Sequence, residues 1–392
     1  MRTFRSLRHR NYRLYFIGQL VSLIGSWTQM TTLMWLAHKR TDTAQWPAFL
    51  VAMQIGPTFL FGAFGGALAD RVPKRRLIGV TQSGFLLAAL ALMGLYYADA
   101  LSLWAMLGIM FFHGCVQAID LPARLAFVPG LVPRENLVNA VALNSLLFNT
   151  ARAVGPAIAG FLLQVAGPGL CFCVNAVSYL AVLLALAWMT LPPEEPVPAV
   201  RTPGGGFGVL ARDRRLLALV LVAGLAAVGG WPLLALLPSF ASQVLGRAED
   251  GYSMMLSAVG GGALLAALTA ATYGSEVRRR RLLFGGLCLV ALALTGMAAA
   301  TEQWMALGAC AVFGYGMILF FATGQSAVQL SVPNHDRGKV MGVWAMMLSA
   351  GVPMGNLVFG PAADAFGLTR VLLVQAATVT VAAAIILIWK VR

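Results

Sequence analysis

Three ionisable side chains lie inside long apolar segments of the chain: His113, Asp120 and Arg152. A charged group at the centre of an apolar layer costs about 2.5–3.5 kcal/mol even on gentle insertion scales, so it usually has a partner or a role. His113 can change its charge near neutral pH. Arg152 can bind an acid or an anionic ligand. We therefore take Arg152, His113 and Asp120 as candidates for ligand binding or proton uptake, while a hydrogen-bonded core histidine remains the alternative for His113.

Neutral polar residues recur at helical spacing in the same kinds of segment. Steps of three and four residues keep side chains on one helical face, and a polar face avoids lipid. Such a face either lines a cavity or forms hydrogen bonds between helices. The candidate cavity residues, together with His113 and Arg152, are Gln19, Ser26, Gln29, Gln117, Asn149, Trp231, Tyr315, Gln325 and Gln329.

The segments that carry these residues have the composition of membrane-spanning helices. The chain has 392 residues, of which 59% are hydrophobic and only 11% charged, whereas soluble domains carry about 25% charged residues. Apolar stretches of about 20 residues, the length of a spanning helix, recur along the whole chain. We predict an all-α membrane protein of about twelve spans, at approximately 14–37, 46–70, 77–98, 102–123, 137–165, 169–190, 216–243, 252–274, 282–300, 303–330, 340–364 and 371–389.

The formal net charge of +14 is explained by topology. Lys and Arg collect in cytoplasmic loops. With a cytoplasmic N-terminus, every Lys and Arg outside the spans falls on the cytoplasmic side except Lys39, Arg40, Arg247 and Arg370. An even number of spans returns the C-terminus to the same side. No zinc-ligand spacing or RNA-binding motif accompanies the charge, so we expect no nucleic-acid partner.

The chain divides into two similar halves. Residues 191–214 hold five prolines and a glycine run, which indicates a cytoplasmic linker rather than a helix. We predict one six-helix bundle over 1–190 and a second over 215–392. The halves agree at an offset of 200 residues, where Gly114, Gly155, Gly160, Gly167 and Val132-Pro133 meet Gly314, Gly355, Gly360, Gly367 and Val332-Pro333. Such repeats are common in transporters, although chance agreement in a glycine-rich chain is the alternative.

Residues 66–78, GALADRVPKRRLI, close the second predicted span and open the third. They resemble the cytoplasmic signature loop of the major facilitator superfamily, with a departure at Pro73, where the family has Gly. The resemblance implies a gate that latches the cytoplasmic side. The expected gate residues are Gly66, Asp70, Arg71, Lys74, Arg75, Asp120 and Arg124, with Asp120 paired to Arg71 or Arg124. A solvated loop that only sets topology is the alternative.

The fifth predicted span contains Gly155, Pro156 and Gly160. This element resembles the glycine-proline motif of antiporter-like facilitators, in which Gly and Pro permit close packing and a bend; a generic packing kink is the alternative. The N-terminal stretch 4–27 and the asparagine-rich residues 120–152 resemble the enterobactin-exporter and macrolide-efflux branch of the superfamily. Drug antiporters often carry an Arg in helix 4 where this chain has Met110, which leaves proton coupling at that position open.

The resemblance implies a secondary transporter of the bacterial inner membrane. We expect a proton-coupled exporter of a small amphipathic molecule, siderophore-like or drug-like, that works by alternating access as a monomer in the lipid bilayer. An importer of a nutrient or metal chelate, and a membrane receptor or subunit, are the alternatives. The sequence has no GxxxxGK[ST] phosphate loop, GxSxG elbow or metal-ligand cluster, so we expect no enzyme, cofactor or metal.

Overall fold

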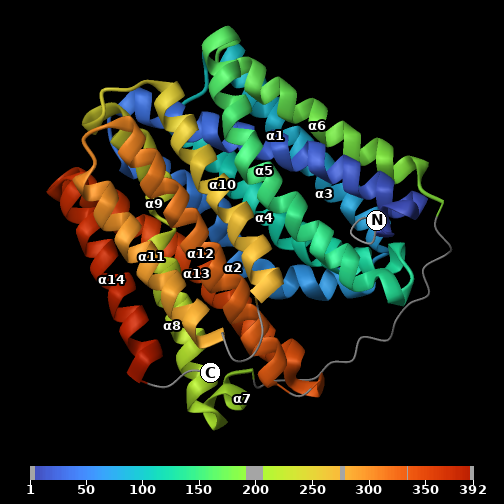
Figure 1. Cartoon of the computed structure of the whole chain (residues 1–392). Helices are drawn as coiled ribbons and strands as arrows, with labels where there is room; N and C mark the ends of the chain where they lie inside the picture. Colours follow the sequence, from blue (N-terminus) through green and yellow to red (C-terminus); the bar gives the residue numbers. More distant parts are fainter. Residues whose placement is uncertain (1–4, 191–205, 274–278, 333, 389–392) are drawn as a thin grey trace. The chain divides into compact units, whose positions relative to one another are not determined.

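A computed structural model of the chain describes residues 5–190, 206–273, 279–332 and 334–388 (Figure 1). Helices account for nearly all of this part, and it contains no strand. The first six long helices are α1 (Arg10–Thr41), α2 (Gln45–Arg71), α3 (Lys74–Tyr97), α4 (Leu103–Phe127), α5 (Leu137–Ala166) and α6 (Pro168–Trp188), with short 3-10 turns η1 (Arg5–Arg8), η2 (Val128–Leu131) and η3 (Arg134–Asn136).

The later helices are α7 (Gly206–Arg212), α8 (Arg214–Gly230), α9 (Leu233–Ser239), α10 (Glu249–Tyr273), α11 (Arg279–Ala299), α12 (Gln303–Ser331), α13 (Asn334–Phe366) and α14 (Leu368–Ile388). A π-helical turn, η4 (Phe240–Val244), continues α9. Because α8, α9 and η4 follow one another almost without a break, they form a single apolar segment over 214–244.

Eleven helical segments of the described residues are long and apolar enough to cross a membrane. α1 has the length, 32 residues, but it carries basic residues at both ends and a row of buried polar side chains between them. With α1 counted as a span, the described residues hold twelve, and each lies within a few residues of its predicted position except at the start of α13. The predicted all-α membrane fold is confirmed.

The chain forms two compact units. Unit 1 comprises residues 1–36 and 53–201, and unit 2 comprises residues 37–52 and 202–392. The end of α1 and the start of α2 therefore belong with unit 2, which the sequence did not indicate. The predicted linker 191–214 is partly helical, because α7 forms over 206–212 and buries Leu210 against its neighbours. Residues 191–205 lie outside the described part.

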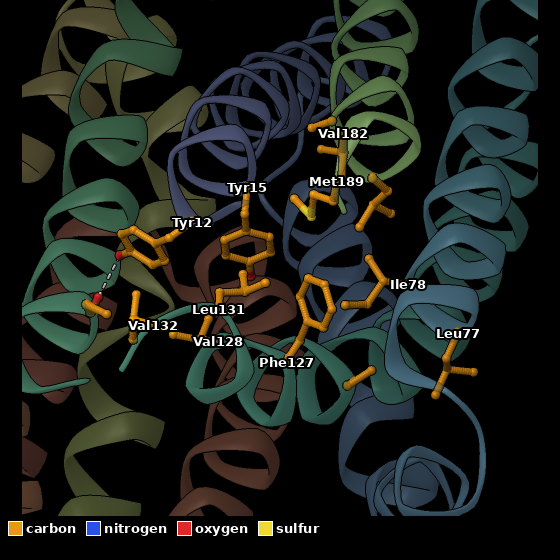
Figure 2. Packing of buried hydrophobic residues seen from close by; sticks show 14 of the residues in the cluster. Tyr12, Tyr15, Leu77, Ile78, Phe127, Val128, Leu131, Val132, Val182 and Met189 are labelled. Carbon is orange, nitrogen blue, oxygen red and sulfur yellow. Dashed lines mark hydrogen bonds between the residues drawn. The ribbon is translucent and has the colours of Figure 1, made fainter. Parts of the chain in front are cut away.

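One end of unit 1 is held by a buried apolar cluster (Figure 2). Tyr12 and Tyr15 of α1 lie in it, and the Tyr15 ring packs 5.8 Å from the ring of Phe127 at the end of α4. The Tyr12 hydroxyl donates a hydrogen bond to the backbone oxygen of Ala140 in α5 (2.8 Å). Ile78 of α3 and Val182 of α6 also lie in this cluster. The cluster therefore joins helices from both ends of the unit's sequence.

Glycines permit the same helix pairs to approach closely in each unit. A Cβ on Gly155 of α5 would lie 2.5 Å from the Cβ of Trp27 in α1. A Cβ on Gly355 of α13 would collide with the backbone oxygen of Val228 in α8. Likewise Gly114 of α4 faces the backbone of α2, and Gly314 of α12 faces that of α10. The 200-residue repeat thus corresponds to repeated helix packing.

Asp364, near the end of α13, binds the first residues of α2. Its carboxylate accepts hydrogen bonds from the backbone N–H groups of Ala44 (2.6 Å) and Gln45 (3.0 Å) at the start of α2. The first N–H groups of a helix have no partner within the helix, and the helix dipole favours an anion there. Asp364 therefore caps α2 from another helix of unit 2.

Replacing Asp364 by Ala should lower the free energy of unfolding by about 1 kcal/mol, because the cap and its charge are both lost. Amide hydrogen exchange should accelerate at Ala44 and Gln45. Glu302→Ala is the matched control, since Glu302 precedes α12 but makes no capping hydrogen bond with its side chain. Equal protection of residues 44 and 45 in wild type and Asp364→Ala would contradict this assignment.

Candidate functional site

A charged network lies in the interior of unit 1, where α1, α3 and α4 meet. The Asp120 carboxylate is fully buried, and its Oδ2 lies 2.6 Å from Nε of Arg124, one turn further along α4. Arg124 Nη1 donates a 2.7 Å hydrogen bond to Oε1 of the buried Gln19 in α1. The sequence left Arg71 and Arg124 as possible partners of Asp120, and in the structure Asp120 pairs with Arg124.

Two side chains of α3 donate hydrogen bonds to Asp120. Thr81 Oγ1 donates to Asp120 Oδ1 at 2.6 Å, and Gln82 Nε2 donates to the same oxygen at 3.2 Å. A buried carboxylate is tolerated only when it is paired and hydrogen-bonded, and both conditions hold here. The guanidinium of Arg124 also lies 6.0 Å from the ring centre of Phe148 in α5. This network, which we call the Asp120 network, therefore links four helices.

A second set of polar contacts joins α1 to α6. Oγ of Ser26 and the hydroxyl of Tyr179 share a 3.0 Å hydrogen bond. Asn175 Nδ2 donates to Oε1 of Gln29 at 2.8 Å, and Ser178 Oγ donates to Asn175 Oδ1 at 3.1 Å. The polar row of α1 is thus directed into unit 1 and bonded between helices. Contact of these side chains with a ligand stays a prediction.

His113 is buried in α4 beside an aromatic pair. Its ring lies 4.5 Å from that of Phe85 in α3, which in turn stacks on Tyr179 at 5.6 Å. Its Nδ1 atom is buried and makes no hydrogen bond to any described residue. A buried polar atom without a hydrogen-bond partner is uncommon, and such an atom can bind a water, an ion or a ligand group.

Arg152 lies on α5 with its guanidinium 5.3 Å from the ring centre of Trp27 in α1, a cation–π geometry. The neighbouring Gly155 makes this approach possible, and its backbone oxygen accepts a 3.0 Å hydrogen bond from Thr28. Pro156 and Gly160 follow within the same continuous helix, and both are buried. Arg152 is thereby held against α1 next to an aromatic surface.

The signature loop occupies the end of α2 and the start of α3. Asp70 and Arg71 are exposed, while Gly66 and Lys74 are half-buried. Arg75 Nη2 donates to the backbone oxygen of Ala187 at the end of α6 (3.2 Å). Asp120 and Arg124, which the sequence grouped with this loop, lie in the Asp120 network, and a part in gating stays a prediction.

The remaining candidates lie outside these polar networks of unit 1. In unit 1, Asn149 donates to the backbone oxygen of Ser145, and Gln117 is half-buried. In unit 2, Trp231 stacks on Phe321 at 6.1 Å, and the Tyr315 hydroxyl donates to Thr269 of α10. Gln325 is exposed and Gln329 half-buried on α12.

The sequence interpretation missed several residues of these networks: Thr81, Gln82, Asn175, Ser178 and Tyr179. A signal was available for the last three, because Ser178 and Tyr179 follow Asn175 by three and four residues and so share one face of α6. Thr81 and Gln82 begin a short polar run with Ser83 between the apolar residues of α3. No group of three or more His, Cys, Asp or Glu in the described ranges has a metal-binding arrangement.

Comparison with known protein families shows to which family the chain belongs. Its residues 1–392 match the family model described as transmembrane secretion effector. The chain belongs to this family. The family is part of the major facilitator superfamily, whose members are membrane transporters and not enzymes. The chain is therefore a multi-pass membrane transporter of a small molecule.

Curated relatives are similar to the chain over most of its length. The staphyloferrin A transporter of Staphylococcus aureus is 26% identical over 367 residues, covering 91% of this chain and 90% of the relative. The enterobactin exporter EntS of Salmonella typhimurium is 26% identical, covering 90% and 85%. Macrolide efflux protein A of Streptococcus pyogenes is 22% identical, covering 93% of each.

Solved structures of other transporters share the fold of this chain. A bacterial homologue of the human lysosomal transporter Spinster matches with a TM-score of 0.76 at 14% identity, covering 97% of each chain. The nucleoside transporter NupG matches with a TM-score of 0.73 at 14% identity, covering 97% of this chain and 99% of its own. At these identities the likeness establishes the major facilitator fold.

Removing one member of the Asp120–Arg124 pair should cost about 3–5 kcal/mol, because the other charge is left buried and uncompensated. We expect both Asp120→Asn and Arg124→Gln to lower the unfolding temperature in detergent. The double variant should be more stable than the sum of the two losses predicts, since neither charge is then stranded. Additive losses would contradict a direct interaction.

Proposed function

We propose that the protein is a proton-coupled exporter of a small amphipathic molecule, siderophore-like or drug-like. It would reside in the bacterial inner membrane with both termini cytoplasmic and work as a monomer by alternating access. Two observations support export: the full-length match to a secretion family, and relatives named for enterobactin export and macrolide efflux.

We infer the substrate class from the contact of the Arg152 guanidinium with the face of the Trp27 ring. A guanidinium attracts an anionic group, and an indole offers a flat apolar surface to an aromatic or macrocyclic one. An amphipathic molecule with an acidic group satisfies both. We assign Arg152 to substrate binding, and Gln117 and Asn149 of unit 1 to the same surface.

For proton coupling we favour His113 among the three candidates. Imidazole titrates in the physiological range, and the buried Nδ1 of His113 has no hydrogen-bond partner in the described residues. Asp120 is committed to Arg124, Thr81 and Gln82, which favours a structural role. Arg152 would influence coupling only through the substrate that it binds.

We assign the signature loop to gating. Asp70 is exposed at the end of α2 and therefore accessible to a partner during the transport cycle. Gly155, Pro156 and Gly160 would support the movement of α5 against α1, because small residues let helices slide at close range. The rocking of two bundles is the usual motion of this class of transporter.

Import of a metal chelate is the second candidate function. It is compatible with the similarity to the staphyloferrin A transporter, whose name specifies a siderophore but no direction. Import and export place the same architecture in the same membrane, so direction must be measured.

Energised inverted vesicles should accumulate the substrate of an exporter. We expect uptake of a siderophore or a lipophilic antibiotic that collapses with a protonophore, and that falls at least about tenfold in Asp70→Asn. Asp99→Asn is the control, because Asp99 is also exposed and its positive φ of 53° suits Asn. Accumulation only in right-side-out cells would replace export by import.

Alanine substitution separates the two roles assigned in unit 1. Arg152→Ala should raise KM about tenfold, which corresponds to the roughly 1–2 kcal/mol of a desolvated cationic contact. His113→Ala should flatten the pH dependence of transport and leave KM less affected. Transport and pH dependence unchanged in both variants would exclude these residues from the mechanism.

A further inference from the structure

A groove runs along the surface of unit 1 between α3 and α6. It is a widely open depression with a volume of about 890 Å³. Its walls are mostly small or apolar, with Gly79, Val80, Leu87 and Leu183 among them. Val80 and Leu87 are each more than 60% exposed, so this face of α3 is covered by no other described part of the protein. In a membrane protein, an open apolar groove of this kind meets lipid.

The groove has a basic end. Pro73, Arg75 and Arg76 line it where α3 begins. Arg75 is held in place by its hydrogen bond to the backbone oxygen of Ala187, the last turn of α6. The Arg76 side chain is exposed and extends the positive charge outward. The groove thus combines two guanidinium groups at one end with an apolar trough along the rest.

The length of the trough matches one membrane leaflet. Arg76 and Leu87 are eleven residues apart on one helix, which corresponds to about 16 Å at a rise of about 1.5 Å per residue. Half of a hydrocarbon core of about 30 Å is about 15 Å. A molecule with an anionic head at the arginines and one acyl chain along the trough would therefore fit the leaflet's own geometry.

We propose that this groove binds an anionic phospholipid of the surrounding membrane. The lipid phosphate contacts Arg76 and Arg75, since guanidinium groups bind phosphate oxygens through paired N–H donors. One acyl chain lies over Gly79, Ser83 and Gly84 between the ridges formed by Leu87 and Leu183. Basic pockets between spanning helices are a recognised form of lipid recognition.

Gly79 shapes the floor of the trough. A Cβ built on Gly79 would meet no atom within 4 Å, so the space above this residue is empty of protein. A larger side chain there would occupy the place of the acyl chain without disturbing a helix contact. Leu also has a better helix propensity than Gly. Gly79→Leu therefore blocks the trough while keeping the helix stable.

The test is native mass spectrometry of the delipidated full-length protein titrated with phosphatidylglycerol. Phosphatidylcholine with the same acyl chains is the neutral comparison. We expect wild type to retain phosphatidylglycerol in preference to phosphatidylcholine. Arg76→Gln should bind phosphatidylglycerol about fivefold more weakly, the change expected for one basic group near an anionic lipid surface. Gly79→Leu should weaken both lipids, because it removes the chain site rather than the charge.

Matched variants control for charge and bulk. Arg215→Gln removes an exposed arginine at the start of α8, outside the groove. Gly94→Leu adds the same bulk to α3 beyond the groove, at another position where a Cβ meets no atom within 4 Å. Both should bind as wild type. Arg76→Gln binding equal to wild type, or equal affinity of wild type for the two lipids, would overturn the proposal.

Discussion

The packing of helices inside unit 1 depends on the buried carboxylate of Asp120. Asp120 is removed from solvent. The free-energy cost of burying its charge is offset by the ion pair with Arg124 and by hydrogen bonds from Thr81 and Gln82. Since Gln19 binds Arg124 in turn, the pair fixes α1, α3 and α4 in one arrangement. Ion pairs of this kind add less stability than equivalent apolar packing but penalise alternatives that separate the charges. In a bundle of apolar helices, such a pair specifies which faces meet.

Close helix contact supplies the other part of the architecture. Lipid tails are as apolar as the helices, so helices associate in a membrane through packing and hydrogen bonds rather than through the hydrophobic effect. Gly155 and Gly355 bring α5 to α1 and α13 to α8, and Gly114 and Gly314 do the same for α4 and α12. The two units thus use equivalent glycines for equivalent contacts, as expected after duplication. Arg152 lies beside the Trp27 ring because Gly155 brings α5 close to α1.

The two faces of α3 serve different surroundings. Thr81 and Gln82 are directed into the unit and bind Asp120. Val80 and Leu87 are directed outward and border the groove whose basic end is formed by Arg75 and Arg76. A spanning helix can therefore contribute to the polar interior and to lipid contact at once, because successive residues are turned by about 100° around its axis.

The sequence alone determined the spans, the repeat and the family, because the length of an apolar segment and the character of a loop are local properties. It also identified Asp120 and Arg152 as residues needing a partner. Only the tertiary structure decided that Asp120 pairs with Arg124 rather than Arg71, that Asp364 caps α2, and that α7 forms within the expected linker. The physical reason is that helical spacing tells which face a side chain occupies, whereas its partner depends on which other helix lies against that face.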